Sequence, residues 1–199
     1  MGAEKSWGHF YAGSGSLEYY ERHTQIHELF LNRILALSPK RVLEAGCGSG
    51  IMSVFFSKRG IQCVAADRDR EVLNHAQKTN ETLGGRVRFM EQDIFRSSFR
   101  DNEFDVVFSQ GVLEHFSDEQ IRKTIAEQLR LAPKVWASVP CKFYNHRDFG
   151  DERLLTELEW RKLLNGPWNV RTEYYYHQRM KKNFLLKRPL MLMFEVSRA

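Results

Sequence analysis

Short runs of apolar residues alternate with longer segments in which apolar residues recur every three or four positions. The short runs have the length and composition of buried strands, and the longer segments have the spacing of amphipathic helices. Regular alternation of the two is typical of a parallel sheet whose strands are joined by crossover helices. We expect strands over residues 41–45, 61–66, 87–91, 105–109 and 135–139, and helices over 51–58, 70–79, 156–164 and a segment that begins near Ser117.

The two ends of the chain depart from this alternation. A Gly-Ser segment near the N-terminus separates an aromatic tip from residues 17–37, where apolar residues at helical spacing predict one long helix that ends at Ser38-Pro39. At the other end, the runs 169–177 and 190–197 are rich in aromatic and apolar residues and are joined by a basic segment. We expect these runs to form an antiparallel pair of strands connected by a loop.

Length and composition indicate one globular domain over residues 1–199. Of the 199 residues, 42% are hydrophobic and 28% are charged, which is ordinary for a chain with one sizeable core. No run of about 18 apolar residues predicts a transmembrane helix, and the N-terminus lacks the pattern of a secretory signal. Cys47, Cys63 and Cys141 lack the paired spacing of a metal site, so we expect three reduced thiols in a cytoplasmic protein.

The net charge of +5 and the pI of about 9.2 raise the question of a nucleic-acid partner. The positive charge gathers between the two C-terminal apolar runs, while most of the chain mixes both signs. We favour a solvated basic loop there and keep an RNA-contacting patch as the alternative. The residues of this cluster are Arg179, Lys181, Lys182, Lys187 and Arg188.

Three glycines at alternate positions follow the first expected strand. In the sequence V-L-E-A-G-C-G-S-G, an apolar run ends in Glu44, and Gly46, Gly48 and Gly50 come next. Glycines this close together let the backbone turn sharply and approach a ligand where a Cβ would clash. A strand, a glycine turn and a helix N-terminus form nucleotide sites in α/β proteins. The dinucleotide fingerprint G-x-G-x-x-G does not fit, because Ile51 stands where its third glycine belongs.

The spacing E-x-G-x-G-x-G resembles motif I of the class I S-adenosylmethionine-dependent methyltransferases. Residues 104–115 (F-D-V-V-F-S-Q-G-V-L-E-H) resemble the fourth strand and its following turn in small-molecule methyltransferases of this class. The resemblance implies a Rossmann-like α/β fold, with a seven-stranded, mostly parallel sheet in the order 3-2-1-4-5-7-6, helices on both faces and an antiparallel C-terminal strand. It covers residues 17–199 and leaves residues 1–16 as a segment that could fold over the cofactor as a lid.

The resemblance also implies that S-adenosyl-L-methionine binds at the carboxyl ends of the strands. In the family the glycine loop approaches the methionine part of the cofactor, and Glu44 helps to position the loop and the ammonium group. We expect Asp67 to accept both ribose hydroxyls, while Asp69 caps the next helix. Asp93 then accepts the adenine amino group, and Ile94 packs against the ring. The expected cofactor residues are Glu44, Gly46, Cys47, Gly48, Gly50, Asp67, Arg68, Asp93, Ile94, Gln110 and Gly111.

The candidates for acceptor chemistry lie at the turn after the fourth strand, in the segment after the fifth strand and in the aromatic tip. The resemblance places His115 at the reaction chamber, although a histidine that packs the next helix is an equally good interpretation. Residues 140–153 form a long, polar and aromatic segment, and such long loops are often functional. A hydroxyl acceptor needs a general base, whereas a neutral amine or a thiolate does not. The catalytic candidates are His115, His146 and Tyr144, and the substrate-binding candidates are Tyr11, Phe143, Tyr144 and Arg147.

The turn at Glu114-His115 raises the question of a metal ion. Some methyltransferases that act on RNA ends or on catechol-like rings use E-x-x-E-H here, with a later histidine, to hold a divalent cation. His146 could supply the later histidine, but Gly111 replaces the first glutamate. Because hard cations depend on the number of oxygen ligands, we expect no metal.

The sequence therefore predicts an S-adenosylmethionine-dependent transferase that methylates an oxygen, nitrogen or sulfur atom of a small molecule. The alternatives are an RNA or protein methyltransferase, and a regulatory protein that binds the cofactor without catalysis. A nicotinamide-linked oxidoreductase is the least favoured, because the third glycine of its fingerprint is missing.

Overall fold

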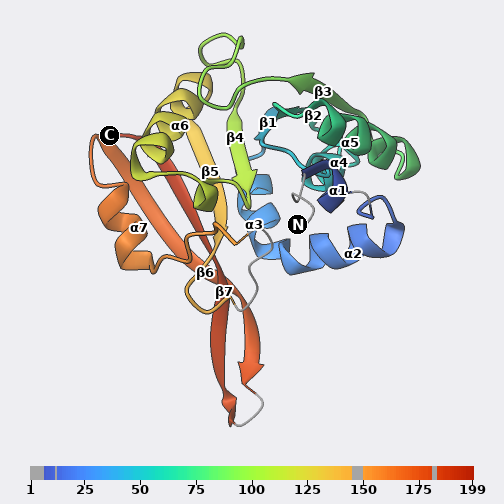
Figure 1. The fold of residues 1–199 in the computed structure, drawn as a ribbon. Helices are drawn as coiled ribbons and strands as arrows, with labels where there is room; N and C mark the ends of the chain where they lie inside the picture. Colours follow the sequence, from blue (N-terminus) through green and yellow to red (C-terminus); the bar gives the residue numbers. More distant parts are fainter. Residues whose placement is uncertain (1–6, 12, 145–149, 181–182) are drawn as a thin grey trace, which may run out of the picture.

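The computed structural model describes residues 7–11, 13–144, 150–180 and 183–199 (Figure 1). Its seven strands form one sheet in the order β3-β2-β1-β4-β5-β7-β6. The strands β1 to β5 pair in parallel, and β7 runs antiparallel to both β5 and β6. The expected fold class and sheet order are therefore confirmed. The strands are β1 (Arg41–Ala45), β2 (Gln62–Asp67), β3 (Val87–Glu91), β4 (Val106–Gln110), β5 (Lys134–Pro140), β6 (Trp168–Met180) and β7 (Asn183–Arg198).

Side chains at alternate strand positions build two apolar cores, one on each face of the sheet. Val42 packs with residues of α3 and α4, and its neighbour Leu43 packs with residues of α6 and α7. Successive strand residues point to opposite faces, so a strand buried on both sides is apolar throughout. The helices are α1 (Trp7–Tyr11), α2 (Leu17–Ile26), α3 (Glu28–Leu35), α4 (Ile51–Ser57), α5 (Arg70–Thr82), α6 (Asp118–Leu131) and α7 (Glu157–Leu163), with a 3-10 turn at Leu113–His115.

Capping residues fix where several helices begin. Ser117 and Gln120 form a capping box at the start of α6, in which each side chain accepts a hydrogen bond from the other's backbone N–H. Thr156 and Glu159 form the same arrangement at the start of α7. Asp69 accepts hydrogen bonds from the first turn of α5, which confirms its expected role as a helix cap.

The single helix expected over residues 17–37 is instead two helices. The backbone leaves helical geometry at His27, which joins α2 to α3 with φ −99° and ψ 14°. His27 is buried, and its Nδ1 lies 2.6 Å from the hydroxyl oxygen of Tyr175 on β6. A hydrogen bond to a strand distant in sequence accompanies this break, and helical spacing could not reveal it.

The C-terminal strands are longer than expected. The segment taken as a basic loop continues both strands, so that β6 reaches Met180 and β7 begins at Asn183. Figure 1 shows the resulting hairpin extending well beyond the rest of the sheet. Lys181 and Lys182 of the basic cluster lie outside the described residues.

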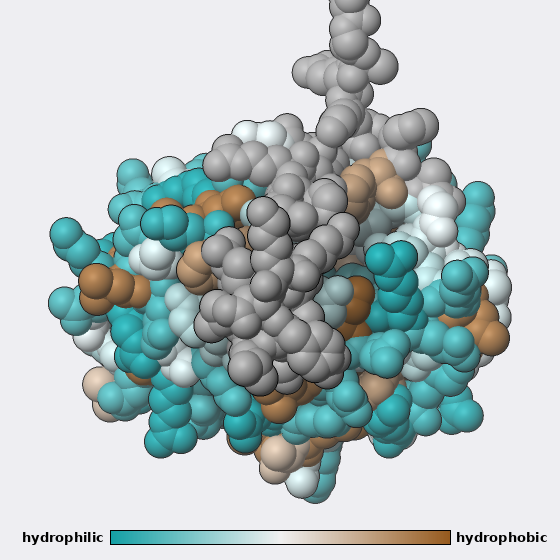
Figure 2. Space-filling view, turned by 90° about the horizontal axis from the view of Figure 1, so that it is seen from below, coloured by the Kyte–Doolittle hydropathy of each residue, from teal (hydrophilic) through white to brown (hydrophobic). Residues whose placement is uncertain are grey.

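The face of the molecule from which the hairpin projects is mostly hydrophilic (Figure 1, Figure 2). Seen from that side, hydrophobic residues appear in small separate groups between hydrophilic ones (Figure 2). Within the described part of the chain, no helix has the length and apolar character needed to cross a membrane.

Candidate functional site

The glycine loop between β1 and α4 has the backbone that only glycine adopts easily. Gly46, Gly48 and Gly50 have φ angles of 72°, 50° and 70°. The N–H groups of Gly46 and Cys47 both donate to the carbonyl oxygen of Ala66, which ties the loop to the end of β2. A Cβ on Gly50 would meet Phe89 at 2.8 Å, so this third glycine serves the packing of α4 against β3.

Glu44 is a buried carboxyl group at the end of β1, with 4% of its surface exposed. Its Oε2 accepts hydrogen bonds from the backbone N–H of Ser53 at 3.0 Å and from the Ser53 hydroxyl at 2.6 Å. Burial raises the pKa of Glu44 to about 7, and the two hydrogen bonds from Ser53 oppose that rise. The side chain therefore joins β1 to α4 beneath the glycine loop.

Asp67, at the end of β2, lies against the same loop. Its Oδ2 accepts a hydrogen bond from the N–H of Gly48 at 3.2 Å, and its Oδ1 accepts one from the N–H of Asp69 at 3.1 Å. Burial raises the pKa of Asp67, and these backbone donors oppose the rise. The carboxylate is held in place from both sides at the mouth of a cavity.

That first cavity, of about 280 Å³, lies where β1, β2, β3 and β4 end. One wall contains the buried amide of Gln128 on α6, whose nitrogen and oxygen have no hydrogen-bond partner among the described residues. Sequence analysis missed Gln128, because it lies within an amphipathic helix and belongs to no motif. The expected cofactor residues that line the cavity are Gly46, Gly48, Asp67, Arg68, Asp93, Ile94 and Gly111.

A second cavity, of about 440 Å³, adjoins the first across Gly111. It is bordered by aromatic residues, by three glutamates and by three histidines, so its wall combines apolar and ionisable groups. Phe143 is 43% exposed and is not part of this lining. His146 and Arg147 lie outside the described residues. The expected site residues that line this cavity are Tyr11, Glu44, Cys47, Gln110, Gly111, His115 and Tyr144.

The N-terminal helix α1 lies over both cavities. Trp7 and Tyr11 line each of them, and their rings stack with centroids 6.2 Å apart. The Tyr11 ring sits directly on the glycine loop, since a Cβ on Gly48 would lie 2.4 Å from it. On the other side, the Trp7 ring meets the His115 ring edge to face at 5.2 Å.

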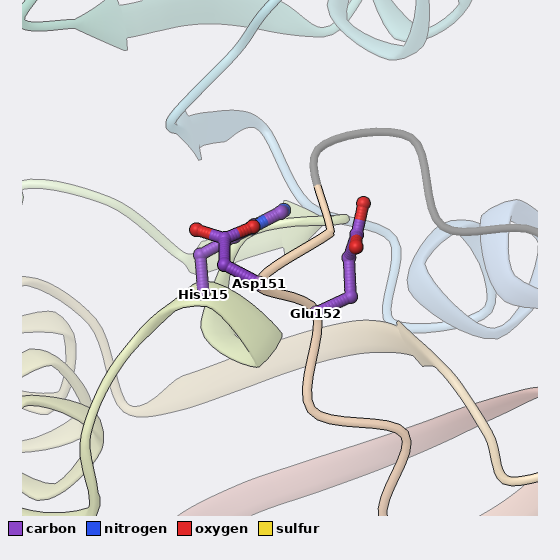
Figure 3. A group of neighbouring side chains, drawn as sticks. All are labelled: His115, Asp151 and Glu152. Atoms are coloured by element: carbon purple, nitrogen blue, oxygen red, sulfur yellow. The ribbon is translucent and has the colours of Figure 1, made fainter.

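A group of ionisable side chains lies where the two cavities meet, with His115 lining both, Asp151 the first and Glu152 the second. His115 Nδ1 lies 2.8 Å from Asp151 Oδ1, and one ligand atom from each of His115, Asp151 and Glu152 lies within 4.8 Å of the others. Figure 3 shows that the three side chains come from two segments and that their polar ends lie on the same side of the chain. Sequence analysis took His115 as a candidate and missed both acidic residues, which had no motif to mark them.

Glu114 lies beside this group and is 2% exposed. Its pKa is raised to about 8, mainly by burial and in smaller part by the nearby charges of Glu152 and Asp151. Its Oε2 has no hydrogen-bond partner among the described residues. A buried carboxyl oxygen without a donor is costly, so this atom calls for a ligand or a proton.

Comparisons with known proteins agree with this arrangement. Residues 42–133 match the family of sequences described as a methyltransferase domain. The chain is 31% identical over 140 residues to a ubiquinone biosynthesis O-methyltransferase of Aliivibrio fischeri. The aligned region covers 66% of this chain and 60% of the relative. The chain is also 33% identical over 102 residues to demethylmenaquinone methyltransferase of Thermus thermophilus, covering 50% of this chain and 46% of the relative. The chain thus spans about half the length of the curated relatives it matches.

Among solved structures, the fold is similar to that of magnesium protoporphyrin IX methyltransferase from Synechocystis PCC 6803 with bound SAH. The TM-score is 0.68 at 20% identity, covering 97% of this chain and 93% of that one. The segment from β1 through α6 is therefore similar to a methyltransferase domain. It includes the glycine loop, Asp67 and the turn at His115, whereas Asp151 and Glu152 lie beyond the matched residues.

Proposed function

We propose that this chain transfers the methyl group of S-adenosyl-L-methionine to a small molecule. The observation that carries the proposal is the glycine loop, which borders the first cavity. Asp67 at the end of β2 and Asp93 just after the neighbouring strand β3 border the same cavity. In open α/β sheets, ligands bind outside the carboxyl ends of the strands. The match of this segment to a methyltransferase domain supports the same cofactor.

We assign the cofactor to the first cavity. The carboxylate of Asp67 is placed to accept the ribose hydroxyls, and Asp93 with Ile94 borders the end assigned to adenine. The methionine part is assigned to the glycine loop, since Gly46 and Gly48 line the first cavity and place no side chain between the backbone and a ligand. The methyl group faces Gly111, which lines both cavities.

We assign the acceptor to the second cavity, where aromatic residues and a few ionisable groups suit a small, partly apolar molecule. A lone pair of the acceptor atom forms a bond to the methyl carbon while the carbon–sulfur bond breaks and its electron pair stays on sulfur. The cofactor leaves as the neutral thioether SAH, so alignment of the reacting atoms is the main task of the protein. A hydroxyl acceptor also loses one proton, and His115 and Tyr144 border the cavity where that proton is released.

Calorimetry with SAH tests the cofactor assignment. We expect the purified chain to bind SAH and S-adenosyl-L-methionine and to bind NAD⁺ much more weakly. Preference for NAD⁺ would contradict the proposal, because the same cavity would then serve a dinucleotide.

Mass spectrometry identifies the acceptor. A metabolite extract is incubated with the chain and with cofactor that carries an isotopically labelled methyl group. We expect one small molecule to gain the labelled methyl group. SAH binding without any labelled product from the extract would favour the regulatory alternative.

A further inference from the structure

Three side chains that could each offer a metal-binding atom lie together between the two cavities: His115 lines both, Asp151 lines the first and Glu152 lines the second. The imidazole of His115 and the carboxylates of Asp151 and Glu152 each offer one atom, and these atoms lie within 4.8 Å of one another (Figure 3). His115 belongs to the turn after β4, whereas the two acidic residues follow β5 in the chain. Imidazole together with carboxylates is a ligand set that suits manganese and other first-row divalent ions.

Arg153 fixes the acidic segment to the turn that carries His115. Its backbone N–H donates to the carbonyl oxygen of Glu114 at 2.9 Å, and its guanidinium donates to the carbonyl oxygen of Phe116 at 2.7 Å. The same guanidinium forms an ion pair of 2.5 Å with Asp118 at the start of α6. Glu152 is in turn held by the N–H of Gly150, which donates to its Oε2 at 2.8 Å. These contacts fix the backbone that carries both acidic residues, while the exposed Asp151 carboxylate lies against His115 Nδ1.

A second observation at this place is independent of the three ligand atoms. Glu114 is 2% exposed and lines the same cavity as His115 and Glu152, yet its Oε2 has no hydrogen-bond partner among the described residues. Of the described residues that line this cavity, Arg22 is the only lysine or arginine, whereas three glutamates line it. The buried carboxyl groups of Glu114 and Glu152 repel each other when both are ionised, unless a proton or a cation neutralises them.

We propose that His115, Asp151 and Glu152 bind a divalent cation, with Glu114 beside it as a further acidic ligand or as its neutralising charge. From the sequence we expected no metal, because Gly111 stands where the first glutamate ligand would be and His146 was the later ligand considered. Asp151 and Glu152 were not considered there, and they supply carboxylates from another segment of the chain. The ion would be of the manganese or magnesium class, because oxygen ligands outnumber nitrogen.

The position of this site gives the ion a role in the reaction. His115 borders both cavities, so an ion held by it lies near the point where the cofactor and the acceptor meet. A cation there orients an acceptor oxygen and favours loss of its proton. This role rests on the proposed function, whereas the binding of the ion rests on the four residues alone.

Electron paramagnetic resonance of Mn²⁺ tests the inference without any methyl transfer. The full chain is stripped with a chelator, saturated with SAH and titrated with Mn²⁺, whose free aqueous signal is lost on binding. We expect about one ion bound per chain. Asp151→Asn and Glu152→Gln should each weaken binding by at least about tenfold, since even residues that only hydrogen-bond to a metal ligand have effects of that size. Glu119→Gln, an exposed change of the same charge at the start of α6, is the matched control and should bind as the native chain does.

The affinity for SAH, measured for every variant, shows whether the cofactor cavity remains intact. A native chain that leaves the Mn²⁺ signal unchanged would overturn the inference, and so would variants with SAH affinity and Mn²⁺ affinity both unchanged. A chain that binds SAH but not Mn²⁺ refutes the metal site and leaves the proposed function standing. A chain that binds Mn²⁺ but not SAH does the reverse.

Discussion

At the scale of single residues, two carboxylates two positions apart have different roles. Both side chains border the first cavity, but Asp69 caps α5 through the backbone N–H groups of Glu71 and Val72, while Asp67 accepts a hydrogen bond from the N–H of Gly48. The cap serves the stability of the helix, and the other carboxylate is placed for a ligand. The pair therefore supplies its own control for the cofactor assignment.

Asp67→Ala should weaken SAH binding by about 1.5–3 kcal/mol, the range for hydrogen bonds to a charged group. Asp69→Ala should lower the free energy of unfolding by about 1 kcal/mol, because a helix cap is lost, and should change the SAH affinity less. Calorimetry with SAH and urea unfolding of both variants check these effects. The ribose role of Asp67 is refuted if the SAH affinity of Asp67→Ala equals that of the native chain.

Glu44 makes the stability of the chain depend on pH. Its pKa in the folded chain is raised from 4.5 to about 7, so between these values the folded state keeps a proton that the unfolded state has released. The free energy of unfolding therefore falls, through this group, as the pH rises from about 4.5 to 7, and it falls no further above that range. Glu44→Gln removes this dependence while keeping an oxygen that can accept the hydrogen bonds from Ser53.

Urea unfolding at pH 5 and pH 8, without cofactor, measures this effect. We expect Glu44→Gln to gain stability relative to the native chain between the two pH values, by up to about 3 kcal/mol for a shift of this size. Other titrating groups cancel in the comparison of the two proteins. The exposed Glu119→Gln should show no such gain, and a difference between native and Glu44→Gln that stays constant with pH would contradict the argument.

Residues in local patterns could be predicted from the sequence, whereas residues brought together by the fold could not. The glycine loop and the cap at Asp69 follow from neighbours in the chain, and both were expected. Glu152 reaches His115 only through the crossover that follows β5 and through the hydrogen bonds of Arg153. Gln128 likewise reaches the first cavity because α6 packs across the sheet.

At the scale of elements, the N-terminal tip was expected as a lid and takes the form of a short helix. The ring of Tyr11 sits on the glycine loop, and Trp7 extends the cover to His115. The spacing of apolar residues predicted the helices of the core. It did not predict the break at His27, which accompanies a hydrogen bond to Tyr175 on a strand distant in sequence. Contacts between distant elements therefore account for this departure.

Tyr11→Ala should impair acceptor turnover more than cofactor affinity. The ring closes the second cavity, and loss of alignment there should lower the rate at saturating cofactor on the order of tenfold or more. Steady-state kinetics and calorimetry with SAH separate the two effects. Leu158→Ala, an exposed change on α7 outside the lining of both cavities, serves as the control. A variant that loses SAH binding but keeps its turnover at saturating cofactor would place the acceptor elsewhere.

At the scale of the whole molecule, the parallel sheet and the two-sided core follow from the alternation of strands and helices, whereas the sheet order was expected from the resemblance to class I methyltransferases. The net charge of +5 does not fix a partner, because the basic cluster at residues 179–188 lies in the sequence outside the segment that matches a methyltransferase domain. Two classes of acceptor, a small molecule and an RNA, remain distinguishable by the response to salt.

A small acceptor should give a kcat/KM that changes little between about 50 and 200 mM salt. An RNA acceptor held by six to ten phosphate contacts would lose about 10³–10⁵ in affinity over the same range, because its counterions would no longer be released as favourably. Kinetics at the two salt concentrations, together with fluorescence polarisation of a labelled RNA, distinguish the two classes. Tight RNA binding that falls steeply with salt would favour the RNA alternative.

The position of α1 has a consequence for the order of events during turnover. Since Trp7 and Tyr11 line both cavities, one movement of α1 would uncover the sites proposed for the cofactor and the acceptor together. We expect this movement to release the methylated product and SAH, and to be slower than the chemical step. Rapid mixing should then show one quick round of product formation, equal to the amount of enzyme, followed by a slower steady rate.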